Sequence, residues 1–237
     1  MAQVLAGTVV LDAEGLSTRA INVAIARLLA EGATDIEVLN VVGQHCLAVA
    51  LKTQARIHFK GSVGWYAAGM NDGAHIVIDG NCGWGLAECQ MGGRVEVHGN
   101  AGSGTSVSIR GGLVFIRGDC GARAGISMKG GTLIIGGSAG YLSGFMMQRG
   151  TIIICGDAAD GLGDSMYEGT IYVGGNVAAY GADAVEKAPT DQDRDFLRTA
   201  LKEFGIDADR LDFKKVESGR RLWNFSKQEP ELWRSAL

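Results

Sequence analysis

The sequence has little of several features that mark large classes of protein. Only two of its 237 residues are proline, and no apolar run approaches 18 residues, so we expect no membrane-spanning helix. The formal net charge of −4 argues against a basic surface of the kind that binds nucleic acid. The N-terminus has no charged segment followed by an apolar one, as secretory leaders have, and we therefore expect a cytoplasmic protein.

Common catalytic and metal-binding motifs are also missing. The five cysteines form no Cys-x-x-Cys pair, so we expect small buried thiols in a reduced compartment and no zinc or iron–sulfur site. The sequence contains no Walker A, HExxH or GxSxG motif. Gly-x-Gly triplets begin at Gly83, Gly102 and Gly161, but none opens a predicted helix, as a dinucleotide-binding loop must. We therefore expect no catalytic residue, cofactor or metal on this chain.

Glycine, in contrast, is abundant, and part of it recurs at a fixed interval. Seven glycines, at positions 61, 80, 99, 118, 137, 156 and 175, each follow the previous one by 19 residues. The residues two and four places before each of them are apolar and mostly β-branched, which indicates a short strand with one buried face. The residue after each of them is Asn, Asp or Ser, which is typical of a turn.

This repeat predicts an all-β fold, a parallel β-helix that is a single-stranded solenoid of about seven 19-residue turns. A leucine-rich repeat would need 20 or more residues and a Leu-x-x-Leu-x-Leu frame, which is absent. A hexapeptide coil would repeat in multiples of six, which 19 is not.

The segments outside the repeat are predicted to cap the coil. We divide the chain into an N-terminal segment, 1–35, a β-helix, 36–185, and a C-terminal segment, 186–237. Apolar residues at helical spacing predict an amphipathic helix over 17–31 and a second one over 191–204. Gly32 and Gly205 mark the ends of these helices.

Two further segments carry weaker patterns. Residues 36–51 are predicted to form two strands that begin the coil. The tail, 211–237, has too few apolar residues for a core of its own, and we expect it to dock along the coil or onto a partner.

Several outward-facing residues are candidates for contacts with a partner. The outward column three residues before the repeated glycine turns apolar in its last four turns, so either the terminal helices or a partner must cover it. A corner rich in large apolar residues and two basic side chains near it are further candidates, as are two aromatic residues of the tail. The candidate interface residues are Phe115, Ile134, Ile153, Tyr172, Tyr141, Phe145, Met146, Met147, Arg123, Lys129, Trp223 and Phe225.

Two binding interpretations compete with this one. His75 shares a column with Arg56 and Arg94, which predicts either a solvated polar ladder or a site for an anionic ligand. A carbohydrate binder would need carboxylates or aromatic rings aligned on one face across several turns, and we find no outward column that meets this need.

Five motifs of the corners and the tail carry a resemblance to a known family: Met70-Asn71, Arg123-Ala-Gly-Ile-Ser-Met-Lys-Gly130, Gly163-Asp-Ser-Met-Tyr-Glu-Gly169, Gly181-Ala-Asp183 and Lys215-Val-x-Ser-Gly-Arg-Arg-Leu-Trp-Asn-Phe225. They are similar to the GXGXG domain that closes the large subunit of glutamate synthase, over about residues 35–185, and the flanking helices and the 215–225 tail extend the likeness. Among free-standing chains, the sequence most resembles the small β-helical subunit of N-methylglutamate synthase (methylamine–glutamate N-methyltransferase).

The resemblance implies a right-handed β-helix that acts as a structural subunit of a hetero-oligomer. In such complexes an amidotransferase-like subunit and a subunit with FMN and an iron–sulfur cluster hold the chemistry, and the coil can line a channel for the amine. An amidotransferase of that class needs Cys after the initiator Met, where this chain has Ala2. Formylmethanofuran dehydrogenase and the formyltransferase/hydrolase complex each include a similar β-helical subunit, and membership of such a formyl-transfer complex is the alternative. A stand-alone ligand-binding β-helix is the other alternative.

Overall fold

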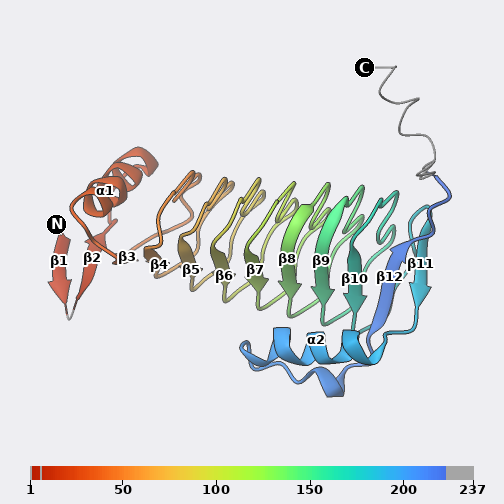
Figure 1. Ribbon diagram of the computed structural model, residues 1–237. Coiled ribbons are helices and arrows are strands. Elements are labelled where there is room, and N and C mark those ends of the chain that lie inside the picture. Colours follow the sequence, from red (N-terminus) through yellow and green to blue (C-terminus); the bar gives the residue numbers. More distant parts are fainter. Residues whose placement is uncertain (1, 6, 223–237) are drawn as a thin grey trace, which may run out of the picture.

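The computed structural model describes residues 2–5 and 7–222 (Figure 1). Its helices and strands follow one another along a single coil with a helix near each end (Figure 1). In chain order they are β1 (Ala2–Leu5), β2 (Thr8–Asp12), α1 (Thr18–Ala30), β3 (Asp35–Leu39), β4 (Arg56–Phe59), β5 (His75–Ile78), β6 (Arg94–Val97), β7 (Leu113–Ile116), β8 (Lys129–Ile135), β9 (Arg149–Ile154), β10 (Thr170–Val173), β11 (Ala184–Lys187), α2 (Asp191–Lys202), a 3-10 turn (Ala208–Arg210) and β12 (Lys214–Ser218).

The predicted parallel β-helix of about seven 19-residue turns, with helices near both ends, is confirmed. Strands β2 to β10 pair in parallel in chain order. From β4 onward paired residues lie 19 apart, as His75 and Arg94 do, except that Lys129 pairs with Arg149 at a register shift in β8. The two apolar columns of each strand point inward, so that Ile76 lies beside Val95 and both are fully buried. The core is therefore one continuous stack of aliphatic side chains along the coil.

The repeated glycine is required by the close approach of successive turns. The N–H of Gly156 donates to the carbonyl of Gly137 at 2.8 Å, and a methyl group at Gly156 would lie 2.8 Å from that carbonyl oxygen. The polar residue after each glycine has a specific role as well: its side chain accepts a hydrogen bond from the backbone N–H of its counterpart 19 residues later. The ladder runs from Ser62 through Asn81, Asn100, Asp119, Ser138 and Asp157 to Asn176, with distances of 2.7 to 3.1 Å.

The opposite flank of the coil, which follows the corner in every turn, has a backbone conformation that the sequence did not reveal. In each turn three alternate residues have positive φ, for example Tyr66, Ala68 and Met70 at 58°, 57° and 54°. In every turn at least one of the three is not glycine, which normally costs about 1 kcal/mol or more per residue. Backbone hydrogen bonds to the turns on either side offset this cost, such as that from Tyr66 N to the Trp84 carbonyl at 2.7 Å.

Both ends of the coil are closed by the chain itself. Ser17 caps α1, and Ile21 and Ile25 of this helix are fully buried in the main core. At the other end β12 pairs antiparallel with β10 and β11, and it places Val216 in the same core. The docking predicted for the tail is thus confirmed for its first part, whereas 223–237 lie outside the described residues. The segment 36–51 forms only β3 and a single bridge at Val42, not two strands.

Helix α2 lies against the outer side of the later strands (Figure 1). Four candidate interface residues, Phe115, Ile134, Ile153 and Tyr172, are buried beneath it and pack against Leu197, Leu201, Phe204 and Phe213. The chain itself therefore covers this apolar column, and our expectation of a partner at these four residues is wrong.

A buried carboxylate fastens α2 to the sheet. The Tyr172 hydroxyl donates to Asp193 Oδ1 at 2.5 Å, and Lys215 lies 3.1 Å from the same carboxylate. Burial raises the pKa of Asp193, but hydrogen bonds from Tyr172, Thr190 and Lys215 outweigh it and hold that pKa well below its usual value. The ionised carboxylate thus ties the helix to two strands.

Candidate functional site

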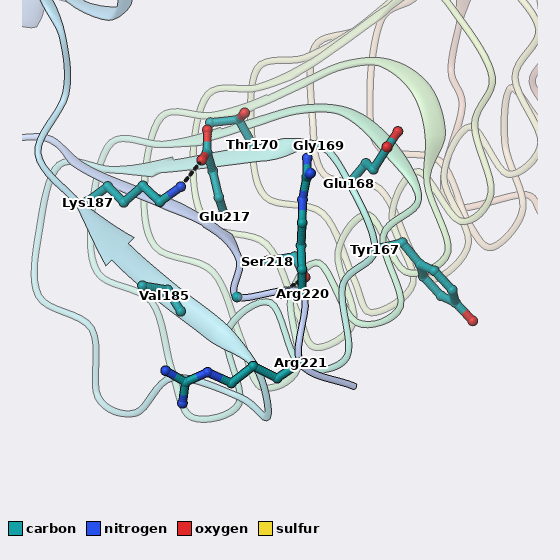
Figure 2. A pocket seen from close by; sticks show the side chains of 11 residues that line it. Tyr167, Glu168, Gly169, Thr170, Val185, Lys187, Glu217, Ser218, Arg220 and Arg221 are labelled. Carbon is teal, nitrogen blue, oxygen red and sulfur yellow. Dashed lines mark hydrogen bonds and ion pairs between the residues drawn. The ribbon is translucent and has the colours of Figure 1, made fainter. Parts of the chain in front are cut away.

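A cavity of about 800 Å³ lies at the C-terminal end of the coil (Figure 2). Residues 167–170 of the last coil turn, strand β11, the end of β12 and the segment after it form its walls. Lys187, Arg220 and Arg221 supply positive charge, and Glu168 and Glu217 supply negative charge. In Figure 2 the Arg220 side chain reaches toward Gly169, whereas Arg221 points away toward β11.

The charges of this cavity are largely paired within the protein. Lys187 Nζ lies 2.6 Å from one Glu217 oxygen, and Lys215 Nζ lies 3.1 Å from the other. Burial raises the pKa of Glu217, but the hydrogen bonds from Lys187 and Lys215 lower it more. Among the described residues no group of three or more His, Cys, Asp or Glu side chains could hold a metal ion.

Asp183 joins two of the motifs that carry the family resemblance. Its Oδ2 accepts hydrogen bonds from the backbone N–H of Arg221 at 2.9 Å and of Leu222 at 3.3 Å, and from the Ser218 hydroxyl at 3.3 Å. A methyl group at Gly219 would lie 2.4 Å from Asp183 Oδ1, so a larger residue there would displace the Asp183 carboxylate. The Gly181-Ala-Asp183 motif therefore serves as an anchor for the Ser-Gly-Arg-Arg segment of the tail.

The outward side of the first strands carries a dense network of ion pairs. Asp79 lies between Lys60 at 2.8 Å, His58 at 2.7 Å and His98 at 3.1 Å. Burial raises the pKa of Asp79, but hydrogen bonds from Lys60 and His58 lower it to about 2.

The column of Arg56, His75 and Arg94 lies on the same side of the coil, and each of its members is also paired with an acidic residue. Arg94 contacts Glu96 at 2.6 Å and Glu203 at 2.8 Å, and the His75 ring lies 2.6 Å from Glu96. The hydrogen bond from His75, opposed by burial and reinforced by Arg94, lowers the pKa of Glu96 to about 2. This arrangement favours the polar ladder over an anionic ligand, because Arg94 is already neutralised.

The cysteines are less uniform than the prediction of buried thiols. Cys82, Cys120 and Cys155 are buried, and burial raises their pKa values to about 12, 11 and 12. Cys46 is exposed and Cys89 is partly exposed, so the prediction is wrong for Cys46. Cys46 follows the first corner, where the coil repeat is not yet regular.

The remaining candidate interface residues lie on the flank in which alternate residues have positive φ, or just beyond its end in each turn. We call this surface the left-handed flank. Tyr141 is 52% exposed, Phe145 and Met146 are partly exposed, and Arg123 is exposed. Lys129 begins β8 and donates to the Ser127 carbonyl at 3.3 Å. Met147 is fully buried in the core, so its inclusion among surface residues is wrong. Trp223 and Phe225 lie outside the described residues.

The same flank carries an aromatic stack that we did not expect. The rings of His45 and Trp65 are 4.7 Å apart at 17°, and those of Trp65 and Trp84 are 5.5 Å apart at 14°. The two tryptophans are 47% and 57% exposed. Our expectation that no outward column aligns aromatic rings is therefore wrong, and the 19-residue spacing of Trp65 and Trp84 was the signal.

Most of this flank carries little charge. Within the five segments 65–70, 84–89, 103–108, 122–127 and 141–146, the only charged residues are Glu88 and Arg123. The strand side, in contrast, is occupied by ion pairs and by α2. On the strand side of the coil, charged and apolar side chains are thus paired or covered within the chain. The other side, defined by these five segments, exposes aromatic and methionine side chains.

Comparison of the chain with models of known protein families and with curated proteins gives no match. Within residues 2–5 and 7–222, no helix has the length and apolar character needed to cross a bilayer. The family resemblance therefore remains an expectation from the motifs, and the function must be argued from the surfaces of the coil.

Proposed function

We propose that this protein is a non-catalytic scaffold subunit of a glutamate-synthase-like complex, and specifically of an N-methylglutamate synthase that forms N-methyl-L-glutamate and ammonia from methylamine and L-glutamate. Its partners in this proposal are an amidotransferase-like subunit and a subunit that carries FMN and an iron–sulfur cluster. The coil bridges the two and lines a path for the amine. The motif resemblance supplies the identity of the complex.

The observation that carries the scaffold role is the weakly charged, left-handed flank. Exposed Trp65, Trp84, Tyr141, Met70 and Met91 lie on it or at its exit, on a backbone that positive-φ residues and inter-turn hydrogen bonds hold in place. Aromatic and methionine side chains are enriched in protein interfaces, and a preformed surface loses little entropy on binding. The core beneath it is filled with aliphatic side chains.

Within this flank we propose that Tyr141, Phe145 and Met146 contact the partner, with Arg123 and Lys129 as polar neighbours. These side chains come from the fourth and fifth of the five segments and their exits, where the coil is covered by α2 on its other side. A partner seated on this flank would leave α2 undisturbed.

A second function, carbohydrate binding, is favoured by one observation, the exposed stack of His45, Trp65 and Trp84. Sugar rings bind to aromatic faces, but here His45, Trp65 and Trp84 turn faces toward one another, so the inner faces of the stack are not available to a sugar. Titration with soluble oligosaccharides, followed by tryptophan fluorescence, tests this alternative directly. Saturable quenching that is lost in Trp84→Ala would support it.

The scaffold proposal is tested by affinity purification of the tagged chain from its own cells, with mass spectrometry of the bound proteins. We expect an amidotransferase-like chain and a flavin-barrel chain in fixed ratio. Recovery of a metallo-hydrolase and a formyltransferase would instead support the alternative of a β-helical scaffold in a formyl-transfer complex. Tyr141→Asp is expected to reduce recovery, whereas Phe196→Ser, an exposed aromatic position on α2, serves as the matched control.

A further inference from the structure

The aromatic stack contains one ring from each of three successive turns of the coil: His45, Trp65 and Trp84. Each ring lies over the glycine of the next turn: a methyl group at Gly64 would lie 2.0 Å from His45 Nδ1, at Gly83 2.4 Å from Trp65 Cδ1, and at Gly102 2.5 Å from Trp84 Cδ1. These glycines therefore make room for the rings. The spacing of the rings, 4.7 and 5.5 Å, matches the distance between adjacent strands, about 4.8 Å.

The stack stops at Trp84 although the backbone that would continue it is present. The next two positions of the column are Ser103 and Ala122, both small, and the following position is Tyr141. Three turns of about 4.8 Å separate Trp84 from Tyr141, so about two ring-sized places lie between them. Gly85 and Gly104, in the neighbouring column, add no side chain. The outer face of Trp84 is thus open toward Ser103.

We propose that Trp233, in the C-terminal tail of the same chain, occupies the place above Ser103 and stacks on Trp84. This inference does not rest on the proposed enzyme complex, and it removes Trp84 from the surface that is open to a partner. The tail of the same chain can reach this place because it leaves the described structure on this flank, where the backbone N–H of Leu222 donates a hydrogen bond to Asp183. Asp183 continues the column of positive-φ residues that contains Ser108, Ser127, Met146 and Ser165.

The length of the tail selects Trp233 among its aromatic residues. Asp183 and Ser108 lie four turns apart, about 19 Å at about 4.8 Å per turn, and Ser103 is five residues before Ser108. Trp233 is 11 residues beyond Leu222 and can reach as far as about 36 Å. Phe225, three residues beyond Leu222, reaches only about 10 Å and falls short.

Charge complementarity points the same way. Arg123 is one turn beyond Gly104, at the border of the open place, and it forms no ion pair with any residue in the described part of the chain. The tail carries Glu229 and Glu231 shortly before Trp233, with Lys227 and Arg234 on either side of this acidic pair and the indole. Either carboxylate can lie beside the Arg123 guanidinium when the indole is stacked, which gives the flank its missing counter-charge.

The test is ¹⁹F NMR of the full chain labelled with 5-fluorotryptophan, with the Trp233 resonance assigned through Trp233→Phe. A labelled peptide of residues 223–237 gives the position of the unstacked ring. We expect the Trp233 resonance in the full chain to be displaced from that position by the Trp84 ring current. The displacement should be lost in Trp84→Ala, largely retained in Trp84→Phe, and lost in Ser103→Trp, which extends the stack over Gly121 and fills the place.

The possible results distinguish a tail docked on its own chain from a free tail, from the tail of a second copy and from a tail docked elsewhere. A Trp233 resonance at the peptide position in the unmodified chain overturns the proposal. A displaced resonance that moves toward the peptide position on dilution shows that the tail of a second copy is bound, which also overturns docking within one chain. A displaced resonance unchanged by both Trp84→Ala and Ser103→Trp places the ring elsewhere and equally refutes the site. Weakening of the displacement by Arg123→Gln, and by added salt, would support the ion pair.

Discussion

Replacement of Gly156 by alanine tests the physical basis of the coil. Gly156 is one of the seven repeated glycines, and a methyl group there would lie 2.7 Å from Ser138 Oγ and 2.8 Å from both the carbonyl carbon and the carbonyl oxygen of Gly137. Two of these three atoms belong to the backbone of the preceding turn, so the clash cannot be relieved by a side-chain rotation alone. The two turns must move apart at this corner.

The expected loss of stability follows from two contributions. Overpacking of a tightly packed site costs about 1–3 kcal/mol. The ladder hydrogen bond from Asp157 N to Ser138 Oγ, 3.1 Å long, is weakened at the same time, at about 1 kcal/mol. A total of about 2–4 kcal/mol corresponds to a fall in Tm of about 5–15 °C for a chain of this size.

Gly92→Ala is the matched control. Its nearest atom would be Asp72 Oδ1 at 3.4 Å, an ordinary contact, and Gly92 does not have positive φ. Alanine there reduces the freedom of the unfolded chain and is expected to leave Tm unchanged or to raise it slightly. Thermal unfolding followed by circular dichroism compares the two variants with the parent chain. Equal Tm values for Gly156→Ala and Gly92→Ala would refute the role assigned to the repeated glycine.

Three further predictions concern other parts of the molecule. Replacement of Asp183 by alanine removes the hydrogen-bond acceptor that holds the segment after β12. We expect trypsin to cleave this variant after Arg220 or Arg221 at least about tenfold faster than the parent chain, with an unchanged far-UV circular dichroism spectrum. Cleavage at the rate of the parent chain would contradict the role of Asp183 as an anchor. The carboxyls of Asp79 and Glu96 have folded pKa values of about 2, below their values in the unfolded chain, so their contribution to stability is complete above about pH 4.5 and is lost as the pH falls toward about 2. The free energy of unfolding, measured by urea titration at about pH 5 and about pH 2.5, should therefore fall less in Asp79→Asn and in Glu96→Gln than in the parent, and an equal fall in all three would contradict this. Cys46 is exposed and should react with a thiol reagent in the folded chain well before Cys82, Cys120 and Cys155, whose pKa values are raised by burial; simultaneous reaction of all four would refute the difference in burial.

Much of the fold could be predicted because the coil is specified one turn at a time. The repeated glycine, the two apolar columns and the Asn, Asp or Ser after each glycine are visible as columns at 19-residue spacing, and each has a local physical cause. The helix limits followed from Ser17, which caps α1, and from Gly205, beyond the end of α2. The ladder of side-chain hydrogen bonds was present in the same column but was interpreted only as turn chemistry.

The surfaces were harder to predict because they depend on contacts between distant segments. Nothing near Phe115 in the sequence shows that Phe204 will stack on it at 3.8 Å, so a covered column could not be distinguished from an open one. The aromatic stack was missed because His45 precedes the regular repeat and lies 20 residues before Trp65. The left-handed flank was missed because its positive-φ positions are occupied by Tyr, Ala, Met, Arg and Leu as well as by glycine.

The scaffold role is tested most directly by the visible absorption spectrum of the chain, recorded alone and again after purification with the proteins that bind it. We expect the chain alone to show no flavin or iron–sulfur absorption and the assembled complex to show both, with glutamate- and methylamine-dependent formation of N-methylglutamate only in the complex. A yellow preparation of the isolated chain, with flavin bound in equimolar amount, would contradict the account.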